Sequence, residues 1–124
     1  ATTVIEAEQK ELVFEGGLIV VKQISAGNWS ISTSPNIALL DQSKISFPLT
    51  LRKWKTGDYF YPLGMNKKKK LNHFLGAAQL SRAEKDKTTV IASGDRIVWV
   101  VGQRLDHRFS ITNQTSNVLL LTLQ

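Results

Sequence analysis

The run Ile97-Val98-Trp99-Val100-Val101 is the feature that most restricts how this chain can fold. Five consecutive apolar residues leave no polar face, so a strand built from them has to be covered on both sides. The run is much shorter than the ~20 residues that a membrane-spanning helix needs. Ser93-Gly94-Asp95 is typical of a hairpin turn that joins strands over Thr88–Ala92 and Arg96–Val101. We therefore predict a central strand that is buried on both faces.

Most of the remaining chain is also predicted to form strands. Gly16-Gly17 can supply the positive φ of a tight turn between Glu11–Phe14 and Leu18–Ile24. Other segments combine alternating or apolar residues with turn residues at their ends. These predicted strands are Trp29–Thr33, Ile37–Leu40, Leu49–Trp54 and Val118–Leu123.

Two short helices are predicted in the middle of the chain. Ser81 and Glu84 fit a capping box, in which side chain and backbone satisfy each other, so a helix is expected over Arg82–Lys87. Strands, two short helices and further strands predict an α+β fold that is mostly β. The other helix follows from apolar residues at positions i, i+3, i+4 and i+7, which are Leu71, Phe74, Leu75 and Ala78.

The chain has 124 residues, no internal linker and no repeat, so we expect a single domain over 1–124. Its first residue is Ala1 rather than Met, which is consistent with a piece of a longer protein. Absence of cysteine excludes disulfides and thiolate metal sites and fits a reducing cytoplasm. We expect a cytoplasmic protein with no membrane partner.

The charge is distributed unevenly. Residues 1–48 hold three Lys and five acidic residues, whereas residues 49–124 hold thirteen Lys or Arg and five acidic residues. Ten of those thirteen bases lie between Arg52 and Lys87. This concentration indicates a polyanionic partner such as nucleic acid or an acidic surface, although a merely soluble basic surface is the alternative.

Four consecutive lysines, Lys67–Lys70, lead into the predicted helix at Leu71. Cations at a helix start oppose the helix dipole and cost a few tenths of a kcal/mol each, whereas a phosphate would be stabilised there. A solvated loop is the alternative, but the adjoining helix start favours polyanion binding. Tyr59 and Tyr61 could stack on exposed bases, while Trp54 is expected in the core, as is the neighbouring Phe60.

Residues for catalysis are not apparent. His73 and His107 are the only histidines, and no metal-binding spacing or nucleotide-binding glycine loop accompanies them. His73 lies opposite the apolar stripe of its helix and is expected at the surface. We predict no catalytic residue, no metal site and no cofactor in this chain.

Several motifs resemble, in the same order, the C-terminal domain of bacterial tRNA(Ile)-lysidine synthetases. The resemblance spans Leu49 to about Thr115, and 1–48 forms a β-rich lead-in to the motif-bearing part, 49–124. The motifs are Leu51-Arg52-Lys53-Trp54-Lys55-Thr56-Gly57-Asp58, Pro62-Leu63-Gly64-Met65, Lys69-Lys70-Leu71 with Phe74, and Ile97–Phe109.

The resemblance implies a fold shared with a domain of the phenylalanyl-tRNA synthetase β subunit. It also implies a role in gripping the acceptor stem of isoleucine tRNA. The full-length ligase would use ATP and lysine to convert the wobble cytidine of a CAU anticodon to lysidine. Its ATP-binding loop is absent from this sequence, so the domain would rely on an N-terminal catalytic domain of the same chain.

The residues and the resemblance together give a set of RNA-binding candidates. Gly57, Asp58 and Gly64 are expected to shape turns, and Asp106 to brace Arg104 or Arg108. A protein-interaction domain that docks on an acidic partner or catalytic domain stays open, as does an enzyme complete in itself. The candidates for RNA binding are Arg52, Lys53, Lys67, Lys68, Lys69, Lys70, Arg82, Lys85, Arg104 and Arg108.

Overall fold

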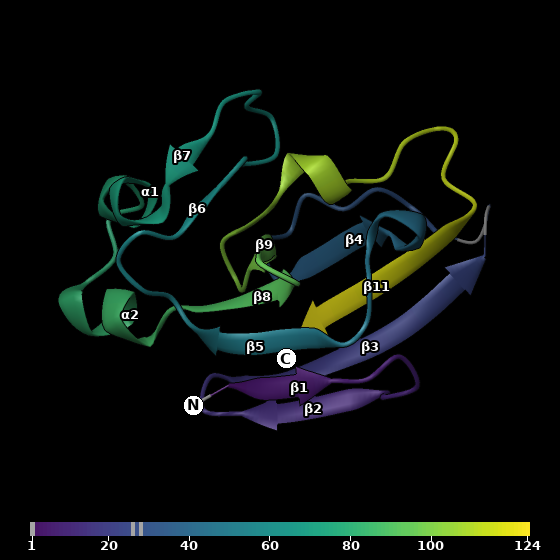
Figure 1. The fold of residues 1–124 in the computed structure, drawn as a ribbon, viewed down its shortest axis with the longest axis horizontal. Helices are drawn as coiled ribbons and strands as arrows, with labels where there is room; N and C mark the ends of the chain where they lie inside the picture. Colours follow the sequence, from purple (N-terminus) through teal and green to yellow (C-terminus); the bar gives the residue numbers. More distant parts are fainter. Residues whose placement is uncertain (1, 26, 28) are drawn as a thin grey trace.

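The computed structural model describes residues 2–25, 27 and 29–124 (Figure 1). Its α-helices are α1 (Leu71–Ala77) and α2 (Arg82–Lys87), and its 3-10 helices are η1 (Gln42–Lys44) and η2 (His107–Phe109). Within these residues no helix is long and apolar enough to cross a membrane. The strands are β1 (Thr3–Ile5), β2 (Glu11–Phe14), β3 (Gly17–Ser25), β4 (Ile37–Asp41), β5 (Leu49–Lys53), β6 (Tyr59–Phe60), β7 (Lys69–Lys70), β8 (Thr89–Ser93), β9 (Arg96–Val100), β10 (Arg104–Leu105) and β11 (Asn117–Leu123).

The strands form two larger antiparallel sheets and one short ribbon. The first sheet has the order β1-β5-β8-β9-β10, and the second has the order β2-β3-β11-β4. The ribbon consists of β6 and β7 alone. Because β11 lies between β3 and β4, the last strand of the chain is hydrogen-bonded to the lead-in residues. The lead-in is thereby built into the same sandwich as the motif-bearing part.

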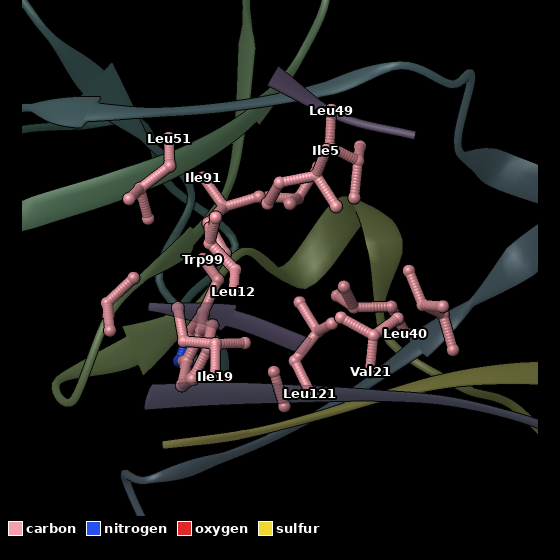
Figure 2. Close-up of a cluster of buried hydrophobic side chains, with 14 of the residues drawn as sticks. Ile5, Leu12, Ile19, Val21, Leu40, Leu49, Leu51, Ile91, Trp99 and Leu121 are labelled. Atoms are coloured by element: carbon pink, nitrogen blue, oxygen red, sulfur yellow. The ribbon is translucent and has the colours of Figure 1, made fainter. Parts of the chain in front are cut away.

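The main core fills the space between the two larger sheets (Figure 2). Such face-to-face packing of two inward-facing apolar surfaces defines a β-sandwich. The first sheet contributes Ile5, Leu49, Leu51, Ile91 and Trp99, and the second contributes Leu12, Ile19, Val21, Leu40 and Leu121.

A second core covers the other face of the first sheet. The ribbon and α1 pack there, at the end of the molecule where teal and green segments meet in Figure 1. Residues of β8 and β9 therefore contact apolar neighbours on both sides, which confirms the prediction for Ile97–Val101. This second core consists of Phe60, Leu71, Phe74, Leu75, Val90, Ile97 and Val100.

A β-bulge changes the alternation within β9. Ile91 pairs with Trp99 while Ala92 pairs with Ile97, so Val98 is an extra residue in the ladder. Val98 and Trp99 consequently both belong to the sandwich core, although they are adjacent in sequence. The backbone carbonyl of Val98 accepts instead from the N–H of Asp106, at 2.9 Å. The bulge thus ties β9 to the loop that carries Asp106.

The α+β class, the two hairpins and both short helices are confirmed, but the predicted strand Trp29–Thr33 is wrong. Residues 29–34 have no strand pairing, and Ile31 is 79% exposed. Serine hydroxyls instead satisfy the local backbone. The N–H of Ser34 donates to the hydroxyl of Ser32, and that of Asn36 donates to the hydroxyl of Ser34. Such local bonds compete with a strand ladder.

Candidate nucleic-acid interface

The ribbon presents aromatic and basic side chains on one side. Tyr59 pairs with Lys70 and Phe60 with Lys69, and side chains alternate between the two sides of a strand. Phe60 is fully buried in the second core, so Tyr59 points away from it and is 40% exposed. Directly opposed residues share one side of an antiparallel pair, which places Lys70 beside Tyr59. The ribbon therefore has an inner apolar side and an outer basic and aromatic side.

Contacts between cations and rings run along this outer side. The ammonium of Lys68 lies 4.0 Å from the ring centroid of Tyr59, and the guanidinium carbon of Arg108 lies 4.4 Å from that of Tyr61. The two tyrosine rings are 6.5 Å apart and nearly perpendicular, at 76°. Cation–π and edge-to-face contacts of this kind are each worth roughly 0.5–1.5 kcal/mol. We call Tyr59, Tyr61, Lys68, Lys70 and Arg108 the ribbon face.

A buried carboxylate fixes one end of the ribbon face. Asp106 is fully buried and accepts from Nε and Nη2 of Arg108, at 3.0 and 2.9 Å. It also accepts from the backbone N–H groups of Arg108 and Tyr61, at 2.8 and 2.9 Å. The hydrogen bonds that Arg108 donates to Asp106 raise the pKa of Arg108 above its ordinary value. The expectation that Asp106 braces an arginine is met by Arg108, because none of these bonds comes from Arg104.

A second carboxylate fixes the chain that enters the ribbon. Asp58 is buried and accepts from Nη1 and Nη2 of Arg52, at 2.9 and 3.0 Å, and from the backbone N–H of Lys55, at 2.8 Å. Burial by itself raises the pKa of Asp58, but the hydrogen bonds from Arg52 and Lys55 outweigh it, so the pKa lies below its ordinary value. The turns beside it use Gly57 and Gly64, whose φ values of 98° and 89° are in the left-handed region.

Arg52 and Lys53 do not join the ribbon face. The side chain of Arg52 is only 21% exposed, and its guanidinium is occupied by Asp58. The ammonium of Lys53 lies 3.7 Å from the carboxylate of Glu15, which follows β2, and both side chains are exposed. The basic residues expected to form one surface are therefore divided between different parts of the fold.

The remaining candidates surround the ribbon on other elements. Lys85 on α2 donates to Oδ1 of Asn72 on α1, at 2.8 Å, and its ammonium lies 5.6 Å from the ring of Trp54. Arg104 on β10 is exposed, with its guanidinium carbon 5.5 Å from the ring of Phe74. Arg82 begins α2 and is exposed, as is Lys67 between the ribbon strands. Lys69 is half-buried on the inner side of the ribbon.

The start of α1 offers less to an anion than the lysine run indicated. Lys70 is its N-cap and provides no side-chain hydrogen bond. The N–H of Leu71, which a helix start by itself would leave unpaired, donates to the backbone carbonyl of Asp58 at 2.9 Å. With only seven residues, α1 also has a short dipole. Attraction for phosphate at this place therefore comes from the ammonium groups.

The residues predicted to bind RNA are all basic, so they do not include Tyr59 and Tyr61, which the structure places on the ribbon face. The sequence predicts that both could stack on bases, but it does not predict the short ribbon that brings Tyr59 beside Lys68. Alternation in Tyr59-Phe60-Tyr61, with an apolar residue between two tyrosines, is the signal that marks an inner and an outer side. Trp54, by contrast, is half-buried, and its Nε1 donates to the carbonyl of Lys85 at 2.7 Å.

The described residues show no constellation for catalysis around this surface. His73 and His107 are exposed and lie on different elements, α1 and η2. In the part of the chain that the structure describes, no three His, Cys, Asp or Glu side chains are grouped so that they could hold a metal ion. The surface is suited to binding by charge and stacking.

Comparison with known families decides what kind of domain this is. A family described as "TilS substrate C-terminal domain" matches residues 49–121. The chain belongs to this family. As a TilS C-terminal domain, it shares its fold with a solved structure described as "Crystal structure of TILS C-terminal domain". The TM-score is 0.83 with 22% sequence identity, over 100% of this chain and 97% of that one. The expected likeness to the phenylalanyl-tRNA synthetase β subunit stays a prediction.

Curated relatives of this TilS C-terminal domain are named tRNA(Ile)-lysidine synthase. The protein from Parabacteroides distasonis is 44% identical over 117 residues, which are 94% of this chain and 25% of that protein. The protein from Bacteroides thetaiotaomicron is 34% identical over 93 residues, which are 75% of this chain and 22% of that protein. The chain thus spans about a quarter of the length of these relatives.

Proposed function

We propose that this domain binds tRNA as part of a tRNA(Ile)-lysidine synthase and grips the acceptor stem of the isoleucine tRNA. The observation that carries the proposal is the ribbon face, where Lys68, Lys70 and Arg108 surround two tyrosines. The carboxylate in contact with this face, that of Asp106, is fully buried beneath Arg108. A surface of this kind attracts phosphates without exposing an acidic group to repel them.

The chemistry of its lysines indicates that this surface positions the RNA. Lysines bind phosphates as point charges and carry no sequence information, so they hold RNA in place without reading it. Arg104 and Arg82 are exposed at the sides of the same end of the fold and can make the more directional, bidentate contacts. The domain would hold the tRNA while chemistry occurs elsewhere.

The catalytic steps would belong to the rest of the enzyme. We place ATP and lysine as substrates at an N-terminal catalytic domain of the same chain, which would convert the wobble cytidine to lysidine in the cytoplasm. The names of the relatives support this assignment, and their length leaves room for such a domain. This domain would raise the affinity for tRNA without taking part in the reaction.

The test measures binding of isoleucine tRNA to the chain at increasing salt concentration. Each phosphate contact adds roughly 0.7–0.9 to the slope of log affinity against log salt. A variant with Ala at Lys67–Lys70 should bind more weakly and show a flatter slope. Equal, salt-independent affinities for both proteins would contradict the proposal.

A protein-docking role is the second candidate, because apolar side chains are also exposed. Ile31 is 79% exposed, and Leu63 and Met65 are 41% and 36% exposed. Ile31 and Leu63 line the same surface hollow, and contiguous exposed apolar groups are typical of contact with another protein. In a competition experiment, a catalytic domain that captures the chain while tRNA does not would favour this role.

A further inference from the structure

We infer that the ribbon face binds an unpaired nucleotide of its RNA by stacking the base on Tyr59. This inference rests on the proposed function and adds a class of ligand to it. Base faces inside a duplex are covered by their neighbours, so only a single-stranded end, loop or bulge can offer one to a protein ring. The domain would therefore recognise RNA that joins a duplex to a single-stranded segment.

Exposure separates Tyr59 from the other aromatic residues near the ribbon. Its side chain is 40% exposed, whereas Phe60, the next residue, fills the second core completely. Trp54 packs against that core and has its N–H bound to a backbone carbonyl. The fold has thus used Phe60 and Trp54 for packing and has left Tyr59 at the surface.

Cations beside the tyrosine rings complete the chemistry for a nucleotide. Lys68 and Arg108 lie within 4.0 and 4.4 Å of the ring centroids of Tyr59 and Tyr61. A base stacked on the Tyr59 ring places its own phosphates nearby, where Lys68 and Lys70 can meet them. Arg108, by contrast, is paired with Asp106 and holds its place over Tyr61. Aromatic rings interleaved with cations are the common means by which proteins hold single-stranded nucleic acid.

The backbone that carries the rings is fixed before any RNA binds. Tyr59 is held in the ladder opposite Lys70, and the N–H of Tyr61 donates to the buried carboxylate of Asp106. The carbonyl of Tyr61 accepts from the N–H of His107, at 2.6 Å. Because the ribbon is already ordered, little conformational entropy is lost when a base stacks on it.

Two RNA hairpins of the same stem test the inference, one blunt and one with a short unpaired 3′ overhang. Wild-type protein should bind the overhang hairpin about 5- to 150-fold more tightly, the range expected for stacking of one base. Tyr59→Ala should lose this preference, whereas Tyr59→Phe, which keeps the ring, should retain it. Lys68→Ala should weaken binding of both hairpins by a similar factor.

The outcomes separate the inference from the proposed function. Equal binding of both hairpins by wild-type protein would overturn stacking and leave tRNA binding intact. A preference that survives in Tyr59→Ala would also overturn it. Failure of wild-type protein to bind either hairpin or whole tRNA would remove the proposed function as well. Tyr59→Ala gives up the contacts of the ring with Lys68 and Tyr61 and should unfold at a somewhat lower temperature, so unfolding is measured alongside and binding is compared well below the transition of every variant.

Discussion

Arg108 and Asp106 form a two-pronged ion pair, with Nε and Nη2 of the guanidinium 3.0 and 2.9 Å from the two carboxylate oxygens. The carboxylate is fully buried, whereas the Arg108 side chain is 28% exposed. The pair holds the guanidinium over the ring of Tyr61, so the folded chain sets the position of both. Arg108 is thus a positioning residue for the tyrosines, and its charge is largely balanced by Asp106.

Replacing Asp106 with Ala should destabilise the fold by about 2–4 kcal/mol. The change leaves the N–H of Tyr61 without its acceptor and the guanidinium of Arg108 without its partner. Urea unfolding measures the loss. Asp95→Asn, in the exposed turn between β8 and β9, is the matched control and should change stability by less than about 0.5 kcal/mol. Equal effects of the two substitutions would contradict the anchoring role of Asp106.

Stability should fall in acid in a way that depends on Asp58. Its pKa in the folded state lies below the ordinary value of 3.8. The unfolded chain therefore binds more protons in the interval between the two values, and stability rises with pH there. The contribution is complete above the unfolded pKa and is lost as pH falls through the folded pKa.

Asp58→Asn should flatten this part of the acid dependence, measured by urea unfolding from about pH 5 down to about pH 2. Stability of the variant should still fall somewhat in acid, because the pKa of Asp41 in the folded state also lies below its ordinary value. Burial raises the pKa of Asp41, but hydrogen bonds from Ser43 and Thr115 lower it below its ordinary value. An Asp58→Asn curve parallel to wild type through this interval would show that Asp58 does not contribute.

Local signals in the sequence predicted the elements that depend on near neighbours. The capping box of Ser81 and Glu84 gave α2 with its correct bounds, because both hydrogen bonds are made within one turn. The apolar run at Ile97–Val101 predicted burial on both faces, because no arrangement leaves one side of it polar. The bulge at Val98 could not be predicted, since it depends on pairing with β8.

The site was harder to predict than the fold, because it depends on contacts between residues that are far apart in the sequence. The ribbon needs only two residues from each strand, so neither strand gives a periodic pattern long enough to recognise. Charge counts located the basic segment correctly but not the partners of its members. Arg52 is bound to Asp58 and Lys53 lies near Glu15, and both pairings depend on the three-dimensional fold.

Ser81→Ala should cost about 0.5–2 kcal/mol, because the hydroxyl of Ser81 accepts from the N–H of Glu84 at the start of α2. The carboxylate of Glu84 would keep its bond to the N–H of Ser81, so only one half of the box is lost. Thermal or urea unfolding checks the value. Arg82→Ala, at the exposed first residue of the same helix, should have little effect on stability. Similar losses in both variants would indicate a general sensitivity of α2 instead of a capping effect.

Lys68→Ala and Lys53→Ala should differ in their effect on tRNA binding, although each removes one exposed lysine. Lys68 lies on the ribbon face over Tyr59, whereas Lys53 lies near Glu15 at the end of β5. Loss of a phosphate contact should lower the slope of log affinity against log salt by roughly 0.7–0.9 for Lys68→Ala. For Lys53→Ala the slope should stay at the wild-type value, because this ammonium already has a carboxylate partner away from the ribbon. Fluorescence anisotropy of labelled tRNA over a salt series measures both slopes, and equal reductions would place the RNA on a broader surface than the ribbon face.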